Sequence, residues 1–120
     1  MGNFKDLLAY QKSYSLAMKI FILSKKFPPE EKYSMTDQIR RSSRSVCTNI
    51  AESIKRKRYK DYFVSKLNDA ETENTETEVW LDFAKDCSYI DTVVYQDLSS
   101  LNTEVGKLVW YMISNPDKFM

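Results

Sequence analysis

The stretch DTVVYQDLSSLNTEVGKLVWYMIS, residues 91–114, carries the clearest structural signal in the chain. Its apolar side chains recur at alternating spacings of four and three residues, at Val94, Leu98, Leu101, Val105, Leu108 and Met112. This spacing follows the turn of an α-helix and not the two-residue period of a strand. It is typical of the seam through which one helix of a bundle packs on its neighbours. The stretch therefore predicts a helix that needs partner helices.

Three further segments repeat the pattern. Their stripes are Leu7, Tyr10, Tyr14, Ala17 and Phe21, with Met18 and Ile22 beside them; Met35, Ile39, Ser42, Val46, Ile50 and Ile54; and Phe63, Leu67, Ala70, Asn74, Thr77, Leu81 and Ala84. We expect helices near residues 4–26, 34–56, 59–87 and 91–114. Because short connections make consecutive helices antiparallel neighbours, the sequence predicts an all-α, up-down-up-down four-helix bundle, a single domain over residues 1–120.

Residues suited to helix ends support these boundaries. Asn3 and Ser34 each precede an acid by three residues, the spacing in which a side chain caps the first turn. Asp91 is a further expected cap. Pro28 and Pro29 should end the first helix, because proline lacks the amide donor and disfavours helical geometry in the residue before it.

The composition argues against an enzyme. The chain has 120 residues and no histidine, so it lacks the usual general base and the commonest metal ligand. We therefore expect no catalytic activity, no metal and no cofactor. Cys47 and Cys87 lie far apart, residues 1–6 lack the apolar core of a signal peptide, and no uncharged apolar run approaches the length of a membrane span. These features predict a cytoplasmic protein that does not enter membranes.

The charges are strongly segregated along the chain. From Arg40 to Lys60 there are eight basic residues and one acid, whereas from Asp61 to Glu104 there are eleven acids and two lysines. The near-neutral total thus hides one segment of about +7 and another of about −9. This polarity fits either a cationic face for a polyanion or complementary faces that bring copies of the protein together.

The most basic stretch is a candidate nucleic-acid interface. Its residues are Lys55, Arg56, Lys57, Arg58 and Lys60, and Arg41 and Arg44 extend it along the second helix. These cations would contact phosphates, while Tyr59 and Tyr62 would offer rings to bases. The alternative is a solvated junction between two helices.

Two pairs of polar residues fall near the apolar stripes. Asn49 and Glu52 lie three positions apart, as do Glu73 and Glu76, so each pair shares one helix face. A carboxylate metal site is one interpretation, but such sites in bundles normally add histidine. We expect instead a buried, hydrogen-bonded layer that fixes helix register, with Arg40 or Arg44 as the charge partner.

Aromatic residues exceed what one bundle core can bury. Those that fall outside the main stripes are Trp80, Phe83, Tyr95, Trp110 and Tyr111. A monomer would expose several of them, so they predict a subunit interface, the alternative being rings that lie flat on the bundle surface.

Many positions of the chain match the pattern of one known protein family. The central matching residues are Phe27–Pro28, Glu31, Tyr33, Thr36, Gln38–Ser42, Ser45–Val46 and Asn49–Glu52. The match extends upstream to Phe4, Leu7 and Gln11–Lys12, and downstream to Leu67, Ala70, Glu73, Glu76–Thr77, Trp80–Leu81, Ala84 and Tyr89–Ile90. On these residues the chain resembles the bacterial 23S rRNA intervening-sequence proteins, also called the S23 or four-helix-bundle protein family. Two positions depart from the family pattern, Ser53 in place of glycine and Tyr10 in place of tryptophan.

This resemblance implies an antiparallel four-helix bundle that assembles into a ring-like homopentamer. It also implies kinship with the accessory protein of diversity-generating retroelements, a basic pentameric barrel that binds nucleic acid and a reverse transcriptase. The biochemical role of the family itself is not established. The sequence thus leaves two hypotheses: a non-enzymatic homo-oligomer whose basic patch binds RNA or other nucleic acid, or a structural or protein-adaptor oligomer without nucleic-acid binding.

Overall fold

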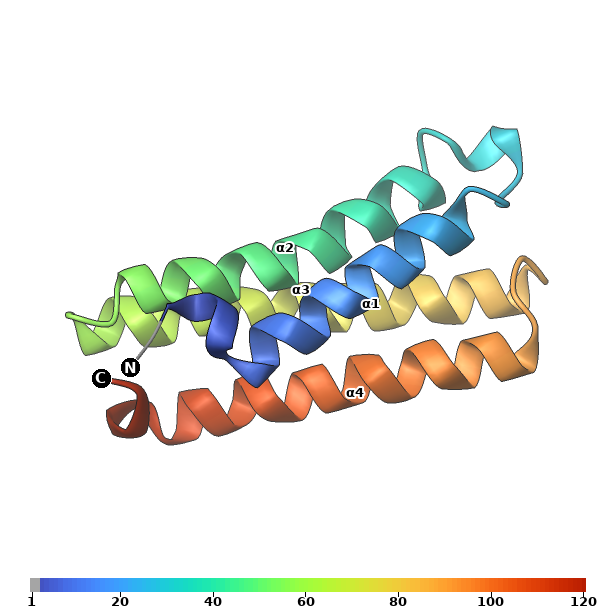
Figure 1. Ribbon diagram of the computed structural model, residues 1–120. Helices are drawn as coiled ribbons and strands as arrows, with labels where there is room; N and C mark the ends of the chain where they lie inside the picture. Colours follow the sequence, from blue (N-terminus) through green and yellow to red (C-terminus); the bar gives the residue numbers. More distant parts are fainter. Residues whose placement is uncertain (1–2) are drawn as a thin grey trace.

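The computed structural model describes residues 3–120 as four long helices joined by short turns (Figure 1). The helices are α1 (Leu8–Ser24), α2 (Met35–Lys55), α3 (Lys60–Asp86) and α4 (Thr92–Ser114), with 3-10 turns η1 (Phe4–Asp6), η2 (Pro29–Glu31) and η3 (Pro116–Phe119). Each helix packs on the next along the chain and α1 also packs on α4, so the four surround one core. The predicted all-α, antiparallel up-down bundle is confirmed, with overall dimensions of 44 × 25 × 20 Å.

The first helix is shorter than predicted. Asn3 accepts a hydrogen bond from the backbone amide of Lys5 at 2.7 Å, and this cap begins η1 and not α1. The extended backbone of Leu7 separates the two elements, so α1 begins only at Leu8. It ends at Ser24, before the proline pair that was expected to stop it. The other three helices begin and end within one residue of the predicted positions.

The predicted caps have different outcomes. Asp91 caps α4 as expected, because its carboxylate accepts the amide of Val94 at 2.8 Å. Ser34 does not cap α2: its hydroxyl donates to Glu31 Oε1 at 2.6 Å, and the same oxygen accepts the amide of Met35 at 3.4 Å. Hydrogen bonds from Ser34 and Tyr89 hold the pKa of Glu31 below its usual range. A carboxylate one turn upstream therefore replaces the serine.

The core consists of two apolar clusters, one toward each end of the bundle. The cluster near η1 and η3 contains Ala9, Val46, Ile50, Ile54, Phe63, Leu67, Ala70, Val105, Val109 and Met112. The cluster at the other end contains Leu16, Ile20, Phe27, Met35, Ile39, Leu81, Ala84, Ile90 and Leu98. Burial of these side chains supplies the main stabilising free energy of the fold.

A layer of polar side chains, the central polar layer, separates the two clusters and consists of Ser42, Asn74, Thr77 and Asn102. The hydroxyls of Ser42 and Thr77 lie 2.9 Å apart across α2 and α3. Asn74 Nδ2 donates to Asn102 Oδ1 at 2.9 Å, and Asn102 Nδ2 donates to the Asn74 carbonyl at 3.2 Å. Among residues 3–120, no buried side-chain nitrogen or oxygen lacks a partner. Since only one register pairs all these groups, the layer fixes how the helices align.

The predicted stripe of the first helix is wrong by about one residue. The buried residues of α1 are Ala9, Ser13, Leu16, Ala17, Ile20 and Ser24. Tyr14, Met18 and Ile22, which the stripe placed inside, are 53%, 42% and 60% exposed. Both faces of α1 are apolar, so periodicity alone fits two rotations of the helix. The face that is buried carries several small side chains, which allow close packing against the other helices.

The predicted seam of the last helix also shifts at two positions. Leu98, Val105 and Met112 are buried as expected, but Asn102 and Val109 take the places expected for Leu101 and Leu108, which are half-buried.

No helix within residues 3–120 combines the length and apolar character needed to cross a membrane.

Candidate nucleic-acid interface

The segment Lys55–Arg58, the basic turn, joins α2 to α3. The Arg56 amide donates to the carbonyls of Glu52 and Ser53, which closes α2, and the extended backbone of Tyr59 leads into α3. Figure 1 shows this turn, in green, at the same end of the bundle as η1 and η3. The helices therefore project four consecutive cations from one tip of the molecule.

The cations of the basic turn remain without carboxylate partners. Lys55, Arg56 and Arg58 are exposed and Lys57 is half-buried, and within the described chain none of the four forms an ion pair. The adjacent Lys60 Nζ lies 2.8 Å from Asp117 Oδ1, an exposed pair that contributes little to stability. The basic turn is therefore free to attract a polyanion.

Two exposed tyrosines lie beside the basic turn. Tyr59 and Tyr62 are 57% and 58% exposed, and their ring centroids lie 5.8 Å apart at an interplanar angle of 89°. The guanidinium carbon of Arg56 lies 5.9 Å from the Tyr62 centroid, within the range of a cation–π contact. The structure thus brings together both kinds of group expected from the sequence.

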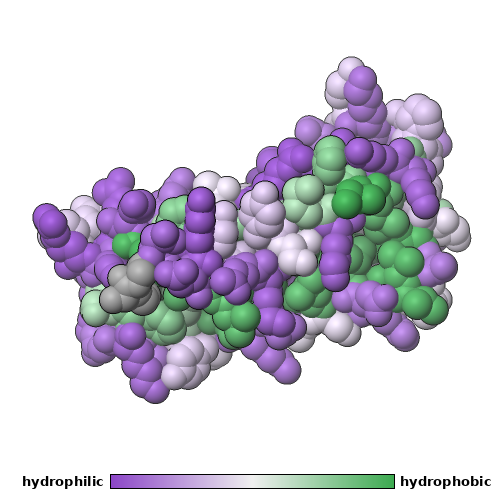
Figure 2. Space-filling view, in the orientation of Figure 1, coloured by the Kyte–Doolittle hydropathy of each residue, from purple (hydrophilic) through white to green (hydrophobic). Residues whose placement is uncertain are grey.

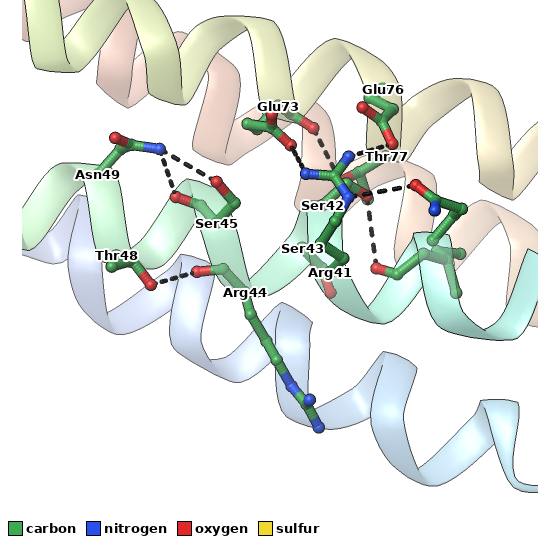
Figure 3. A network of polar contacts seen from close by, with 12 residues as sticks. Arg41, Ser42, Ser43, Arg44, Ser45, Thr48, Asn49, Glu73, Glu76 and Thr77 are labelled. Carbon is green, nitrogen blue, oxygen red and sulfur yellow. Dashed lines mark hydrogen bonds and ion pairs between the residues drawn. The ribbon is translucent and has the colours of Figure 1, made fainter. Parts of the chain in front are cut away.

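Arg41 lies apart from this cluster and is already paired. Its guanidinium donates to Glu73 Oε2 and Gln38 Oε1, each at 3.1 Å, and to Glu76 Oε2 (Figure 3). The expected arginine partner of the glutamate pair therefore exists, but it is Arg41 and not Arg40 or Arg44. Arg41 is therefore not part of the candidate nucleic-acid interface, because its guanidinium donates to carboxylates of its own chain.

The environment of Glu76 favours its charged form. Partial burial by itself raises the pKa of this carboxyl, but hydrogen bonds from Arg41 and Trp80 together with the Arg41 charge outweigh it. The pKa of Glu76 consequently lies below its usual range. The Trp80 indole donates to the same Oε2 atom at 3.0 Å, which holds the carboxylate against α3.

Arg40 and Arg44 point away from this network toward α1. Both guanidinium carbons lie over the Phe21 ring, 4.9 and 5.3 Å from its centroid, and Arg40 Nε donates to Ser24 Oγ at 2.7 Å. Figure 3 shows the Arg44 side chain extending from α2 on the side opposite Glu73. Arg44 is exposed but lies about three turns of α2 from the basic turn, so the predicted patch is divided in two.

The predicted layer of Arg40, Asn49, Glu52, Glu73 and Glu76 does not form. Asn49 is half-buried and donates within α2 to the carbonyl and hydroxyl of Ser45, at 2.9 and 3.1 Å. Glu52 is exposed and pairs with Lys66 at 2.9 Å. Long side chains keep their charged ends near water. The polar layer inside the bundle is instead the central polar layer, which is made of shorter side chains. Its residues lie on or beside the apolar stripes predicted from the sequence.

The Cys47 thiol is not activated as a nucleophile. Burial raises the pKa of the Cys47 thiol, against hydrogen bonds with Ser13 and Tyr10 that lower it, so the thiolate is disfavoured. Cys87 is exposed and unpaired with any other cysteine. Within residues 3–120 no group of three or more acidic or cysteine side chains is arranged to hold a metal ion.

An apolar surface runs along the outer side of α1. Tyr14, Met18 and Ile22 follow one another at four-residue steps, and we call them the outer α1 line. A groove of about 430 Å³ lies between this helix and α2, and another of about 400 Å³ lies beside Ile22 and Val94. Figure 2 shows apolar patches on the face formed by α1 and α4.

The aromatic residues expected at a subunit interface are divided between two environments. Phe83, Trp110 and Tyr111 are 52%, 57% and 47% exposed. Trp80 and Tyr95 are half-buried, and their polar atoms bond to Glu76 and Asp82 of α3. Three of the five predicted aromatic residues thus remain candidates for a subunit interface. The structure adds the outer α1 line to them.

Comparison with known proteins shows that most of the chain is similar to one protein family. The sequence profile of the family described as 23S rRNA-intervening sequence protein matches residues 5–110. A crystal structure of a protein with unknown function from the S23 ribosomal protein family of Bacteroides thetaiotaomicron is 32% identical, with a TM-score of 0.80, covering 89% of this chain and 96% of that chain. No curated protein matches the chain. The similarity therefore runs from η1 into α4.

Proposed function

The chain belongs to the family of 23S rRNA-intervening sequence proteins, and from this premise we propose that its basic turn binds nucleic acid through phosphate contacts. The observation that supports the proposal is that Lys55–Arg58 lacks carboxylate partners within the described chain, whereas Arg41 and Lys60 have them. Unpaired cations clustered at one tip attract phosphates and release their counterions. Such binding depends on salt and reads little base sequence.

Charge reversal of the turn tests this proposal. We expect the triple variant Lys55→Glu, Arg56→Glu, Arg58→Glu to bind a fluorescein-labelled 12-nucleotide RNA roughly tenfold or more weakly than the native chain at 50 mM salt. Fluorescence anisotropy measures the affinity. Binding that is unchanged in this variant would contradict the assignment of the site.

A matched control separates position from net charge. The variant Lys25→Glu, Lys26→Glu, Lys32→Glu changes the formal charge by the same amount, from +1 to −5, but lies at the opposite end of the bundle. We expect it to retain most of the RNA affinity. An equal loss in both variants would mean that net charge alone governs binding and that the basic turn is no specific site.

We also infer that copies of the chain associate through the outer α1 line. Contiguous exposed apolar residues on a small protein mark an interaction surface. The charges favour a second copy as the occupant: α1 and α2 together carry six cations and two acids, whereas α3 and α4 carry four cations and ten acids. One side of a protomer therefore complements the opposite side of another.

These two proposals are compatible. The outer α1 line lies along the length of the bundle, whereas the basic turn lies at its tip, so association through α1 leaves the turn open. A ring of protomers would then gather several basic turns, and multiple contacts to one strand strengthen binding. If the native chain does not bind the RNA but copies of it still associate, the function that remains is that of a structural or protein-adaptor oligomer.

A further inference from the structure

We propose that the tyrosines beside the basic turn bind unpaired bases, so that the ligand of this tip is single-stranded nucleic acid and not a duplex. This inference rests on the phosphate contacts proposed above and specifies their substrate class. It depends on Tyr59 and Tyr62, whose exposure the phosphate contacts alone do not explain.

Three other tyrosines have an anchored hydroxyl: Tyr89, Tyr95 and Tyr111 are hydrogen-bonded to the charged side chains of Glu31, Asp82 and Lys118. In the described chain the hydroxyls of Tyr59 and Tyr62 form no such bond. Tyr14 and Tyr33 are also exposed without one, but only Tyr59 and Tyr62 share a hollow with a cation of the basic turn. Exposed aromatic rings beside a positively charged surface are the platforms on which proteins stack single-stranded bases.

The geometry of the pair favours a strand without helical stacking. The two ring planes stand at 89°, so bases lying flat on both rings would face in different directions. Successive bases of a duplex are parallel and paired at their edges, and they cannot adopt that arrangement. A single strand rotates freely about its backbone and can present each base separately.

The surface around the rings provides separate places for bases and for phosphates. An open hollow of about 570 Å³ is lined by Arg58, Tyr59, Lys60, Asp61 and Tyr62. The carboxylate of Asp61 disfavours a phosphate in the hollow but can accept a hydrogen bond from an N–H group of a base, such as N3–H of uracil. The Arg56 guanidinium lies over the Tyr62 ring and Arg58 lines the hollow, so both can contact phosphates next to the bound bases.

Removing the bases from the ligand tests the inference directly. The native chain is titrated at 50 mM salt with a fluorescein-labelled 12-nucleotide oligouridylate, with an abasic strand of the same phosphate number, and with a 12-base-pair RNA duplex. We expect the oligouridylate to bind roughly tenfold more tightly than the abasic strand. It should also bind more tightly than the duplex when both affinities are expressed per nucleic-acid strand. Equal affinity for the strands with and without bases would overturn the inference.

Variants then assign the effect to the two rings. The double variant Tyr59→Ala, Tyr62→Ala should lose the preference for bases, whereas Tyr59→Phe, Tyr62→Phe should keep it, because phenylalanine retains the ring. Tyr33→Ala is the matched control, since Tyr33 is 85% exposed with Lys32 over its ring but lies at the opposite end of the bundle. A preference that survives in the double alanine variant would contradict the assignment. Circular dichroism confirms that each variant folds.

The proposal of phosphate binding and the inference of base stacking are contradicted by different results. If charge reversal of the basic turn abolishes binding but bases make no difference, phosphate binding stands and the stacking inference is wrong. If the native chain binds none of the three ligands, both proposals are wrong.

Discussion

At the scale of single residues, a shift of one position decides which groups meet. The sequence placed Glu73 and Glu76 on one helix face and assigned them an arginine partner, and that much is confirmed. The choice of Arg40 or Arg44 was wrong because, at 3.6 residues per turn, both lie about 60–100° to the same side of Arg41 around the helix. Arg41 faces α3, whereas Arg40 and Arg44 lie against Phe21. Periodicity alone does not fix the rotation of α2 this finely.

The ion pair of Arg41 with Glu76 predicts a pH-dependent stability. Because the native pKa of Glu76 is lowered, its carboxylate stabilises the fold above the pKa of an unfolded glutamate, about 4.3. That stabilisation is lost as the pH falls through the lower native value. We therefore expect Glu76→Gln to lower the melting temperature at pH 7, and this deficit to disappear as the pH falls below the native pKa.

Thermal unfolding monitored by circular dichroism between pH 2 and pH 7 provides the measurement. Glu78→Gln is the control, since Glu78 lies on the same helix, is exposed and forms no ion pair within the described chain. Its melting temperature should follow that of the native chain at every pH. A deficit in Glu76→Gln that stays constant across the range would contradict the assigned role of the charge.

At the scale of helices, the sequence predicts where each helix lies and how consecutive helices run better than it predicts which face of a helix is buried. The apolar period and the cap at Asp91 placed α2, α3 and α4 within one residue. The buried face of α1 was missed because apolar side chains cover both of its faces. The central polar layer was also missed, although Ser42, Asn74 and Thr77 lie on the predicted stripes. Small polar residues at stripe positions were the signal that would have found it.

The central polar layer explains why α4 contains a glycine. A Cβ atom at Gly106 would lie 2.7 Å from Asn74 Oδ1, and Asn74 is held in place by its hydrogen bonds to Asn102. Alanine in place of a helical glycine normally stabilises a protein by about 0.5–1 kcal/mol. Here we expect Gly106→Ala to destabilise the fold by about 1–2 kcal/mol, the cost of disturbing buried hydrogen bonds.

A double-mutant cycle isolates this contact. In an Asn74→Ala background the steric conflict is absent, so Gly106→Ala should stabilise the fold by its ordinary helical contribution. Urea unfolding of the native chain, both single variants and the double variant measures the four free energies of unfolding. If Gly106→Ala has the same effect in both backgrounds, the glycine is not required by Asn74.

At the scale of the whole molecule, the bundle and the family are established, and the assembly is a proposal. Charge segregation was visible in the sequence, but only the structure separates cations that are paired, such as Arg41, from those of the basic turn that are not. The outer α1 line was not predicted, because the same residues had been assigned to the core. An interface between copies cannot be read from periodicity when a helix is apolar on two faces.

Solution mass tests the association of copies. Placing two charges on the outer α1 line with Met18→Glu, Ile22→Glu should reduce the mass measured by light scattering to that of one chain, 14.1 kDa, because burying unpaired carboxylates is costly. Val93→Glu, at a 68% exposed position on α4, is the control and should leave the mass unchanged. An unchanged mass in the double variant would exclude α1 as the contact surface.

The salt dependence of RNA binding tests the central claim most directly. For single strands the logarithm of the affinity falls with the logarithm of the salt concentration by about 0.7 per phosphate contacted, so four cations of the basic turn give a slope of about −3. Titrations of the 12-nucleotide RNA from 50 to 200 mM salt should show this slope for the native chain and a slope near zero for the variant with Lys55, Arg56 and Arg58 changed to Glu. A native affinity that is independent of salt, or equal slopes for the two proteins, would contradict the claim that the basic turn binds phosphates.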